Sequence, residues 1–247
     1  MENEPVYLVL GATGGIGSAT ARMLAASGAR LLLAGRSADK LAALGAELDA
    51  PTCSLDAREP GSVEAAATAA VTRYGRLDGI ANLVGSLLLK PAHLTSVQEW
   101  QETLELHANS SFGAVRAAAA HMRKQGGAVV LVSSAAARLG LANHEAIAAA
   151  KGAVQGLALA AAATYAPFGI RVNVVAPGLV ETPLTAAITG TDALRKGSEA
   201  MHALGRIGRP QEVASAVAWL LHPDQAWVTG QIIGVDGGLA TVRSRRA

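Results

Sequence analysis

The chain has 247 residues, 51% of them hydrophobic and only 3% aromatic, so it is long enough to bury a substantial core of small aliphatic side chains. Its formal net charge of +2 excludes a general attraction for nucleic acid or anionic membrane surfaces. The single cysteine, Cys53, excludes an internal disulfide and is typical of a reducing compartment, so we expect a cytoplasmic location.

Neither the N-terminal residues nor the most alanine-rich stretch of the chain predicts membrane targeting. The first predicted strand begins at Val6, which leaves no room for a signal peptide. The most alanine-rich stretch, residues 146–166, carries Lys151 and Gln155, so we do not expect it to span a membrane. No metal site is expected either.

The first chain segment with a functional signal is a glycine turn. Five apolar residues, 6–10, predict a buried strand, and Gly11-x-x-x-Gly15-x-Gly17 follows at once. Residues 18–26 are good helix formers. Glycines between a strand and a helix let the backbone approach a ligand closely, and the free N–H groups of the helix start attract an anion. The pattern is typical of a dinucleotide pyrophosphate site.

Strand and helix patterns then alternate almost to the end of the chain. Strands are expected at residues 6–10, 30–35, 52–55, 77–84, 128–132, 170–175 and 231–235. Helices are expected at residues 18–26, 37–48, 62–74, 109–125, 145–166 and 211–221, and Ser37 is expected to cap the second of them. A further helix is expected to start at a capping box at residues 95–98. Residues 182–208 are expected to be irregular.

This alternation predicts an α/β fold of the Rossmann-like, doubly wound type. Strands separated by helices of ten or more residues pair in parallel with right-handed crossovers. Because no linker or internal repeat divides the sequence, we expect one domain, residues 1–247, with a sheet of about seven strands. Its ligand crevice should lie at the carboxyl ends of the strands, where the strand order reverses.

Several motifs, in order, resemble the short-chain dehydrogenase/reductase family. They are the glycine turn, Asn82-Leu83-Val84-Gly85, Asn109, Ser134, Lys151, Arg171-Val172-Asn173, Pro177-Gly178-x-x-x-Thr182 and Asp236-Gly237-Gly238. The resemblance extends to about Gly238. It implies a nicotinamide dinucleotide cofactor, a substrate lid at about residues 179–208, and a homotetramer with an interface formed by the helices at 109–125 and 145–166.

The resemblance also implies a set of site residues. Asn109, Ser134 and Lys151 stand where the family has catalytic residues. The expected cofactor-binding residues are Gly11, Thr13, Gly14, Gly15, Ile16, Gly17, Arg36, Ser37, Asp56, Asn82, Gly85, Lys151, Pro177, Gly178, Val180 and Thr182. Asp56 falls where family members place an acid on the adenine, and the resemblance favours that role over the alternative, in which the aspartate caps the following turn.

One departure from the family pattern concerns the chemistry itself. The family motif Tyr-x-x-x-Lys reads Ile147-Ala-Ala-Ala-Lys151 here. Residues four apart share a helix face, so the lysine ammonium would lower the pKa of a phenol at position 147 toward neutrality. Isoleucine has no proton to give, and the loss of a positioned acid/base typically removes a factor of about 10²–10⁴ in rate.

Other residues near the altered position have alternative interpretations. His144 could supply the missing proton, because imidazole titrates near neutral pH. The favoured interpretation is that His144 and Glu145 are solvated residues at a helix start. His107 could lie near the site or pair with a helix end. Tyr165 lies at the far end of the same predicted helix and cannot replace the phenol.

The residue after the second strand predicts the cofactor. An acid there would bind the adenine ribose hydroxyls and repel a 2′-phosphate, whereas Arg36 would attract that phosphate. We therefore expect NADP(H) to be preferred over NAD(H). The alternative is a surface arginine beside a helix start.

Taken together, the residues predict an NADP(H)-dependent oxidoreductase that acts on a small carbonyl or alcohol through an atypical active site. A competing hypothesis is a non-catalytic NADP(H)-binding sensor or partner subunit of the same fold. A third is lyase-like or isomerase-like chemistry that uses the bound cofactor or Lys151 differently. The presence of Asn109, Ser134 and Lys151 favours chemistry, and Ile147 favours its loss.

Overall fold

The computed structural model describes residues 4–243, and residues 1–3 and 244–247 lie outside the described part. Within it, seven parallel strands form one sheet in the order β3-β2-β1-β4-β5-β6-β7. Their bounds are β1 Val6–Leu10, β2 Arg30–Gly35, β3 Thr52–Ser54, β4 Gly79–Asn82, β5 Gly127–Val132, β6 Ile170–Pro177 and β7 Ile232–Val235. The predicted Rossmann-like fold is confirmed.

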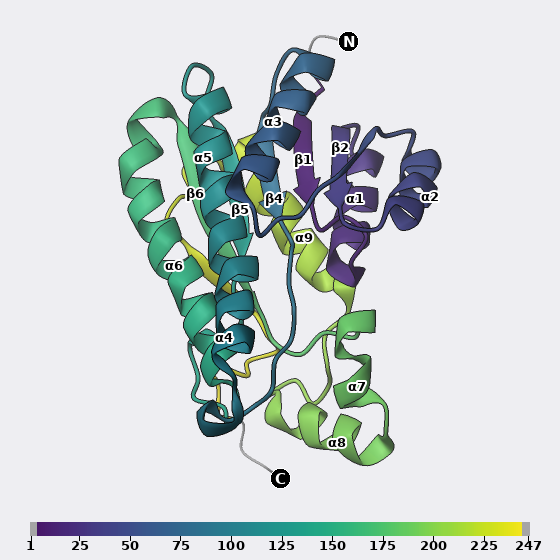
Figure 1. Ribbon diagram of the computed structural model, residues 1–247, viewed down its shortest axis with the longest axis vertical. Helices are drawn as coiled ribbons and strands as arrows, with labels where there is room; N and C mark the ends of the chain where they lie inside the picture. The colour runs from purple at the N-terminus through teal and green to yellow at the C-terminus, as the bar shows by residue number, and fades with distance from the viewer. Residues whose placement is uncertain (1–3, 244–247) are drawn as a thin grey trace.

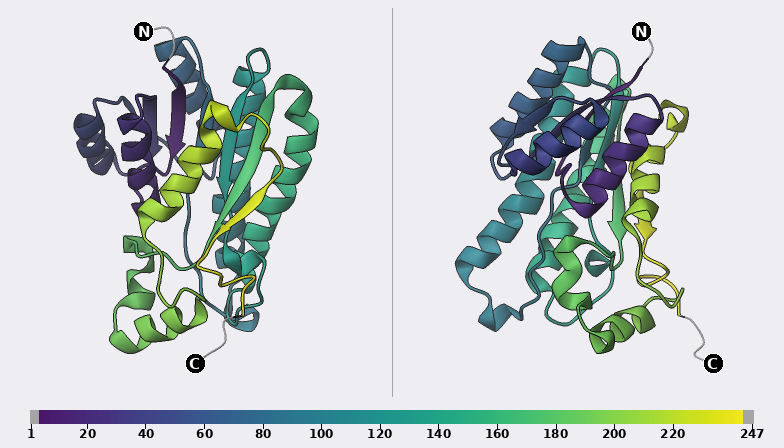
Figure 2. Two further views of the ribbon diagram at one scale, coloured as in Figure 1. Left: turned by 180° about the vertical axis from the view of Figure 1, so that it is seen from behind. Right: turned by 90° about the vertical axis from the view of Figure 1, so that its right-hand side faces the viewer.

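Helices cover both faces of the sheet (Figures 1 and 2). One face carries α1 Gly15–Ala26, α2 Ala38–Leu48 and α9 Pro210–Leu221. The opposite face carries α3 Pro60–Tyr74, α5 Ser110–Met122 and α6 Glu145–Tyr165. The central strands are therefore buried on both sides, which explains why they read as continuous apolar runs.

The core consists of two clusters, one on each side of the sheet. Successive side chains of β1 alternate between them: Leu8 packs with α3 and α5, and Val9 packs with α1 and α9. The alanine-rich composition lets these helices approach closely, because their contact positions are mostly alanine.

The strand order reverses at β1, which pairs in parallel with β2 on one side and β4 on the other. The connections after β1 and β4 therefore leave in opposite directions, and a crevice opens between them at the carboxyl edge of the sheet. The glycine turn follows β1 at that edge. The functional residues expected from the sequence follow the neighbouring strands.

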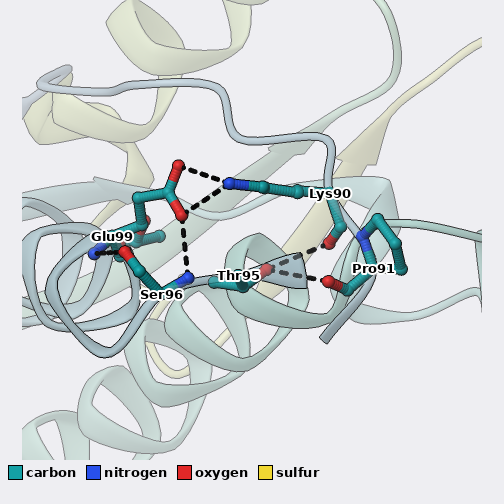
Figure 3. A network of polar contacts seen from close by, with 6 residues as sticks. Lys90, Pro91, Thr95, Ser96 and Glu99 are labelled. Atoms are coloured by element: carbon teal, nitrogen blue, oxygen red, sulfur yellow. Dashed lines mark hydrogen bonds and ion pairs between the residues drawn. The ribbon is translucent and has the colours of Figure 1, made fainter. Parts of the chain in front are cut away.

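The segment between β4 and α5 differs from the expectation in detail. The strand ends at Asn82, and α4 begins at Val97 with a capping box made by Ser96 and Glu99, one residue later than expected. Figure 3 shows that the Glu99 carboxylate accepts from Ser96 N and also pairs with Lys90 Nζ at 2.9 Å. The Lys90 hydrogen bond is the main reason that the pKa of Glu99 falls to about 2.

A second difference is that no loop separates α4 from α5. After α4 Val97–Leu104 the backbone makes a π-helical turn, Glu105–Asn109, and continues directly into α5. The helix expected to begin at Asn109 and reach Gln125 is thus the end of one continuous helical rod, and it stops at Met122. Single π turns inside helices are frequent at functional sites, because they displace one side chain from the regular helical surface.

The expectation that residues 182–208 are irregular is wrong. Two helices, α7 Ala186–Thr189 and α8 Asp192–Met201, lie there, beyond the carboxyl edge of the sheet (Figure 1). The Thr191 side chain accepts a hydrogen bond from Leu194 N and caps α8. Threonine is a common N-cap residue, but the segment was expected to be irregular because it contains few apolar residues.

Among the described residues, one helix, Glu145–Phe168, is long and apolar enough to cross a membrane by length and composition. It comprises α6 and a short 3-10 turn. Its buried residues, including Val154 and Ala158, pack in the core against the sheet, which accounts for its composition.

Candidate active site

The turn between β1 and α1 requires glycine at two positions for different reasons. Gly11 has a φ of +71°, and a Cβ there would lie 2.8 Å from the carbonyl carbon of Leu83. A Cβ on Gly17 would collide with the carbonyl oxygen of Gly11. The first N–H groups of α1 have no side-chain cap, so the turn presents unsatisfied donors at a helix N-terminus. These features fit the pyrophosphate of a dinucleotide.

The segment after β6 folds over this turn. A Cβ on Gly15 would lie 2.7 Å from Cγ2 of Thr182. The Thr182 backbone N–H donates to Thr185 Oγ1 at 3.0 Å, and Val180 forms an isolated bridge with Gly208. The structure thus brings together two parts of the expected cofactor site that are far apart in the sequence.

The carboxyl ends of β2 and β3 form a cationic end of the crevice. Arg36 follows β2 and is exposed, without a hydrogen bond or ion pair among the described residues. Arg58 donates to both Asp56 oxygens, with Nε–Oδ2 at 2.9 Å, and this is the main reason that the pKa of Asp56 falls to about 2. The charge of Arg36 also lowers it. Two arginines therefore flank one permanently ionised aspartate.

Two residues in this region differ from what the sequence led us to expect. Ser37 occupies the N-cap position of α2 as expected, but its hydroxyl makes no capping hydrogen bond. Arg58 was not among the expected site residues. Its only signal in the sequence was a charge two positions after Asp56.

The end of β4 is fixed by a buried amide. Asn82 Nδ2 donates to the hydroxyls of Ser110 at 3.0 Å and Ser111 at 3.2 Å, and its Oδ1 accepts from Val84 N. Because this side chain is fully engaged, Asn82 shapes the crevice through the backbone that follows it. Gly85 lies exposed at the end of that segment.

The π turn carries His107 rather than Asn109 into the interior. His107 is only 1% exposed, and its Nε2 accepts from Ser86 N at 3.4 Å, so the other nitrogen, Nδ1, carries the proton. That Nδ1 is buried without a partner among the described residues. Asn109 is partly exposed, and its side chain makes no hydrogen bond within the described part. The interpretation of His107 as a helix-end partner is wrong.

Ser134 and the Lys151 amino group both lie at the end of β5. Lys151 Nζ donates to the carbonyl of Val132, the last residue of β5, at 2.7 Å. Ser134 Oγ accepts from Ala136 N at 3.1 Å, which leaves its own O–H free to donate. Between them, the hydroxyl of Ser133 donates to the Lys151 carbonyl. Burial without a carboxylate partner lowers the pKa of Lys151 to about 7.

Ile147 lies one turn before Lys151 on α6 and is buried. The three tyrosines of the chain all lie elsewhere. The hydroxyls of Tyr7 and Tyr74 donate to the carbonyls of Leu221 and Leu31, at the amino edge of the sheet. Tyr165 ends α6, about 21 Å along the helix from Lys151. No phenol of this chain therefore reaches the site.

The two residues before α6 differ in their contacts. His144 occupies the N-cap position, and its Nδ1 lies 2.7 Å from the carbonyl oxygen of Ala142. Glu145 accepts from Ala92 N at 3.4 Å, which connects the start of α6 to the segment before α4. Glu145 therefore has a structural contact, whereas the second ring nitrogen of His144 remains available.

The end of β6 is held by a buried histidine. Gly178 N donates to the carbonyl of Val235 at 3.1 Å, which fixes the backbone after Pro177. His202, at the end of α8, accepts from Leu179 N through Nε2 at 3.1 Å, and its Nδ1 lies 2.8 Å from the carbonyl oxygen of Ser198. This histidine anchors the lid to the strand end.

A cavity of 940 Å³ lies at the opposite edge of the sheet, beside the amino ends of the strands. Tyr7, Arg171 and the fully exposed Trp227 line it. The Arg171 guanidinium is engaged by backbone carbonyls, among them that of Leu220 at 2.8 Å. This cavity contains none of the residues expected for catalysis.

Comparison with known proteins agrees with this geometry. The family model described as "Enoyl-(Acyl carrier protein) reductase" matches residues 11–240. A solved short-chain type dehydrogenase/reductase from Mycobacterium ulcerans superimposes with a TM-score of 0.92 and 32% identity, over 97% of this chain and 91% of that one. The chain belongs to the short-chain dehydrogenase/reductase family.

Two further similar proteins have names or titles that specify a substrate or a cofactor of their own. The cis-4-hydroxycyclohexanecarboxylate dehydrogenase of Sinomonas cyclohexanicum is 38% identical over 97% of this chain and 98% of its own. The actinorhodin polyketide ketoreductase, solved with NADPH, has a TM-score of 0.92 and 30% identity, over 98% of this chain and 99% of its own. The family to which this short-chain dehydrogenase/reductase belongs thus includes oxidoreductases of alcohols and carbonyls.

Proposed function

We propose that this short-chain dehydrogenase/reductase is an NADP(H)-dependent oxidoreductase of small alcohols and ketones with an atypical active site that lacks the family phenol. The observation that carries the proposal is the meeting of two features at one sheet edge. The glycine turn offers free helix N–H donors there, and Ser134 and Lys151 lie at the end of β5. The likeness to a cyclic hydroxy-acid dehydrogenase supports an alicyclic alcohol or ketone as substrate.

The residues of this chain would have the following roles in cofactor binding and catalysis. The α1 N-terminus, Arg36 and the segment after Pro177 would hold the dinucleotide, which supplies or accepts hydride. The free O–H of Ser134 would donate to the substrate oxygen and orient it. Ile147, one turn before Lys151 on α6, has no polar atom with which to bind the substrate oxygen.

The cofactor preference rests on the arginines after β2 and β3. A 2′-phosphate beside the ribose would meet Arg36, whose guanidinium has no other partner in the described part of the chain. Arg58 lies close by but is already engaged by Asp56. A charge-assisted hydrogen bond to phosphate contributes about 1.5–3 kcal/mol, which corresponds to an affinity ratio of about 10 to 100.

Titration with NADPH and NADH is the direct test. We expect the native protein to bind NADPH about 10 to 100 times more tightly, and Arg36→Asp to abolish that preference. Lys124→Asp is the matched control, because Lys124 is exposed beyond α5 at the opposite edge and the charge change is equal. Equal affinities in the native protein, or an unchanged ratio in Arg36→Asp, would refute the cofactor assignment.

The second candidate function is a non-catalytic NADP(H)-binding protein, and the absence of a phenol from the site favours it. Turnover of cis-4-hydroxycyclohexanecarboxylate with NADP⁺, and of the corresponding ketone with NADPH, distinguishes the two. Cofactor binding with no turnover of either substrate would favour the non-catalytic function.

We also propose a homotetramer in the cytoplasm. The outer faces of α5 and α6 expose Phe112 and Leu159 among small residues such as Gly156. Light scattering at micromolar concentration should give four times the chain mass of 24.9 kDa. Gly156→Arg should reduce that mass, whereas Gly61→Arg on α3 should not. A monomeric native protein would contradict the proposal.

A further inference from the structure

Lys151 occupies an unusual position for a lysine. It is 6% exposed, and its amino group donates to a single protein acceptor, the carbonyl of Val132. A lysine ammonium has three N–H donors, so two of them remain for other partners at the end of β5. Lysine is almost never fully buried without an anionic partner, because removing the charge from water is costly.

Within the described part of the chain, no anionic side chain pairs with Lys151. Packing against α6 brings His107 from the π turn close enough that the Lys151 charge helps to lower the pKa of His107, although burial is the main cause, and that pKa falls to about 2. His107 is therefore neutral at every working pH. The other titratable side chains on α6 and the elements packed against it do not shift the pKa of Lys151: they are Glu99, Glu102, Glu105, Arg116, His121, Glu145, Tyr165 and Arg171.

We propose that Lys151 itself is the acid/base group of this site and exchanges the proton with the substrate oxygen in place of a phenol at position 147. This inference rests on the proposed function. Three observations carry it: no tyrosine reaches the site, the amino group lies at the strand end that continues into Ser134, and no carboxylate of residues 4–243 pairs with it.

The proposed step balances as follows. In reduction, the carbonyl carbon gains hydride from the reduced dinucleotide, and the π electron pair of the C=O bond moves to oxygen. An O–H bond forms with a proton from Lys151 Nζ, whose N–H bond breaks, leaving a neutral amine that water then protonates. Oxidation of the alcohol runs in reverse, with the neutral amine as base.

The burial of Lys151 is suited to both directions. A pKa of about 7 gives comparable populations of ammonium and amine at neutral pH. Proton transfer is most effective when the pKa of the catalytic group lies near the working pH. An arginine at the same position would keep its charge throughout and could give no proton.

The proposal is tested first on the native protein. It contains five lysines, so ¹³C labelling of the lysine ε carbon gives a small set of NMR signals, and Lys151→Arg identifies the signal of Lys151. We expect that signal to titrate near pH 7. We also expect kcat for ketone reduction to fall with the same midpoint as the pH rises. Titration of Lys151 above pH 9 would overturn the proposal.

Two variants separate the roles of charge and proton. Lys151→Arg should bind NADPH within about threefold of the native protein but lose at least a hundredfold in kcat. Retained turnover in Lys151→Arg would overturn the proposal, because the charge alone would then suffice. His144→Ala should leave the pH midpoint unchanged, whereas loss of that midpoint would assign the proton to His144.

A third variant provides an independent perturbation. His107→Asp introduces a carboxylate beside Lys151 and should move its titration upward by at least one pH unit, while the neutral His107→Asn should not. Equal titration midpoints of Lys151 in His107→Asp and His107→Asn would overturn the proposal. Failure of NADPH to bind the native protein refutes the proposed function instead, and the lysine titration remains measurable in that case.

Discussion

Ile147→Tyr should increase ketone reduction at least about tenfold over the native protein. The new phenol would lie one helical turn before Lys151, on the same face of α6, and near Ser134. The usual contribution of a positioned acid/base is about 10²–10⁴, and tenfold is a conservative share of it, because Lys151 already serves as the proton donor in our proposal. The rate should be measured with NADPH against several ketones and across pH.

The matched control is Ile147→Phe, which adds the ring without the hydroxyl. Because Ile147 is 4% exposed, either ring could cost about 1–3 kcal/mol in overpacking, so the free energy of unfolding and the NADPH affinity should be measured beside the rate. A folded Ile147→Tyr variant that binds NADPH and is no faster than Ile147→Phe would show that more than the phenol is missing. The non-catalytic function would then be favoured.

Gly17→Ala should weaken NADPH binding by at least about a hundredfold. The added Cβ would collide with the carbonyl oxygen of Gly11 and lie 3.0 Å from Cα of Ala12, both backbone atoms that move only if the whole turn moves. A displaced turn would lose two or more charge-assisted hydrogen bonds from α1 to the pyrophosphate, each contributing about 1.5–3 kcal/mol. Calorimetric titration gives the affinity.

Gly61→Ala is the control for this change. Gly61 lies in the first turn of α3, has open space around it, and does not need a positive φ. Alanine there should leave NADPH affinity unchanged and stabilise the fold by about 0.4–1 kcal/mol, because it restricts the unfolded chain. NADPH affinity that is equal in Gly17→Ala and Gly61→Ala would show that the turn does not hold the dinucleotide.

The sequence predicted the sheet well because its signals were local. Buried parallel strands such as β1 and β6 are continuous apolar runs bounded by glycine or proline, and the helices between them are alanine-rich. The lid was predicted poorly for the same reason. Its helix α8 buries none of its residues and is mostly polar, so its few apolar residues, among them Leu194 and Met201 on one face, gave only a weak signal beside the Thr191 cap.

The candidate site divides in the same way between local and long-range causes. The glycine turn, Arg36 and the spacing of Ile147 and Lys151 are sequence-local features, and the chain itself determined them, with no tertiary information. The shift of side-chain positions that the π turn makes within the α4–α5 helical rod depends on long-range packing. The π turn that buries His107 and leaves Asn109 partly exposed arises where α4 passes into α5 against α6, and a regular helical period cannot reveal it.

The sequence by itself therefore determined the fold class, the dinucleotide turn and the absence of a phenol at position 147. Only the tertiary structure decided the pKa of Lys151. Its low pKa results from burial beneath residues distant in sequence, at the end of β5 and opposite a neutral His107, where no carboxylate of the described residues pairs with it. Desolvation depends on everything that surrounds a charge, so it emerges only when the chain has folded.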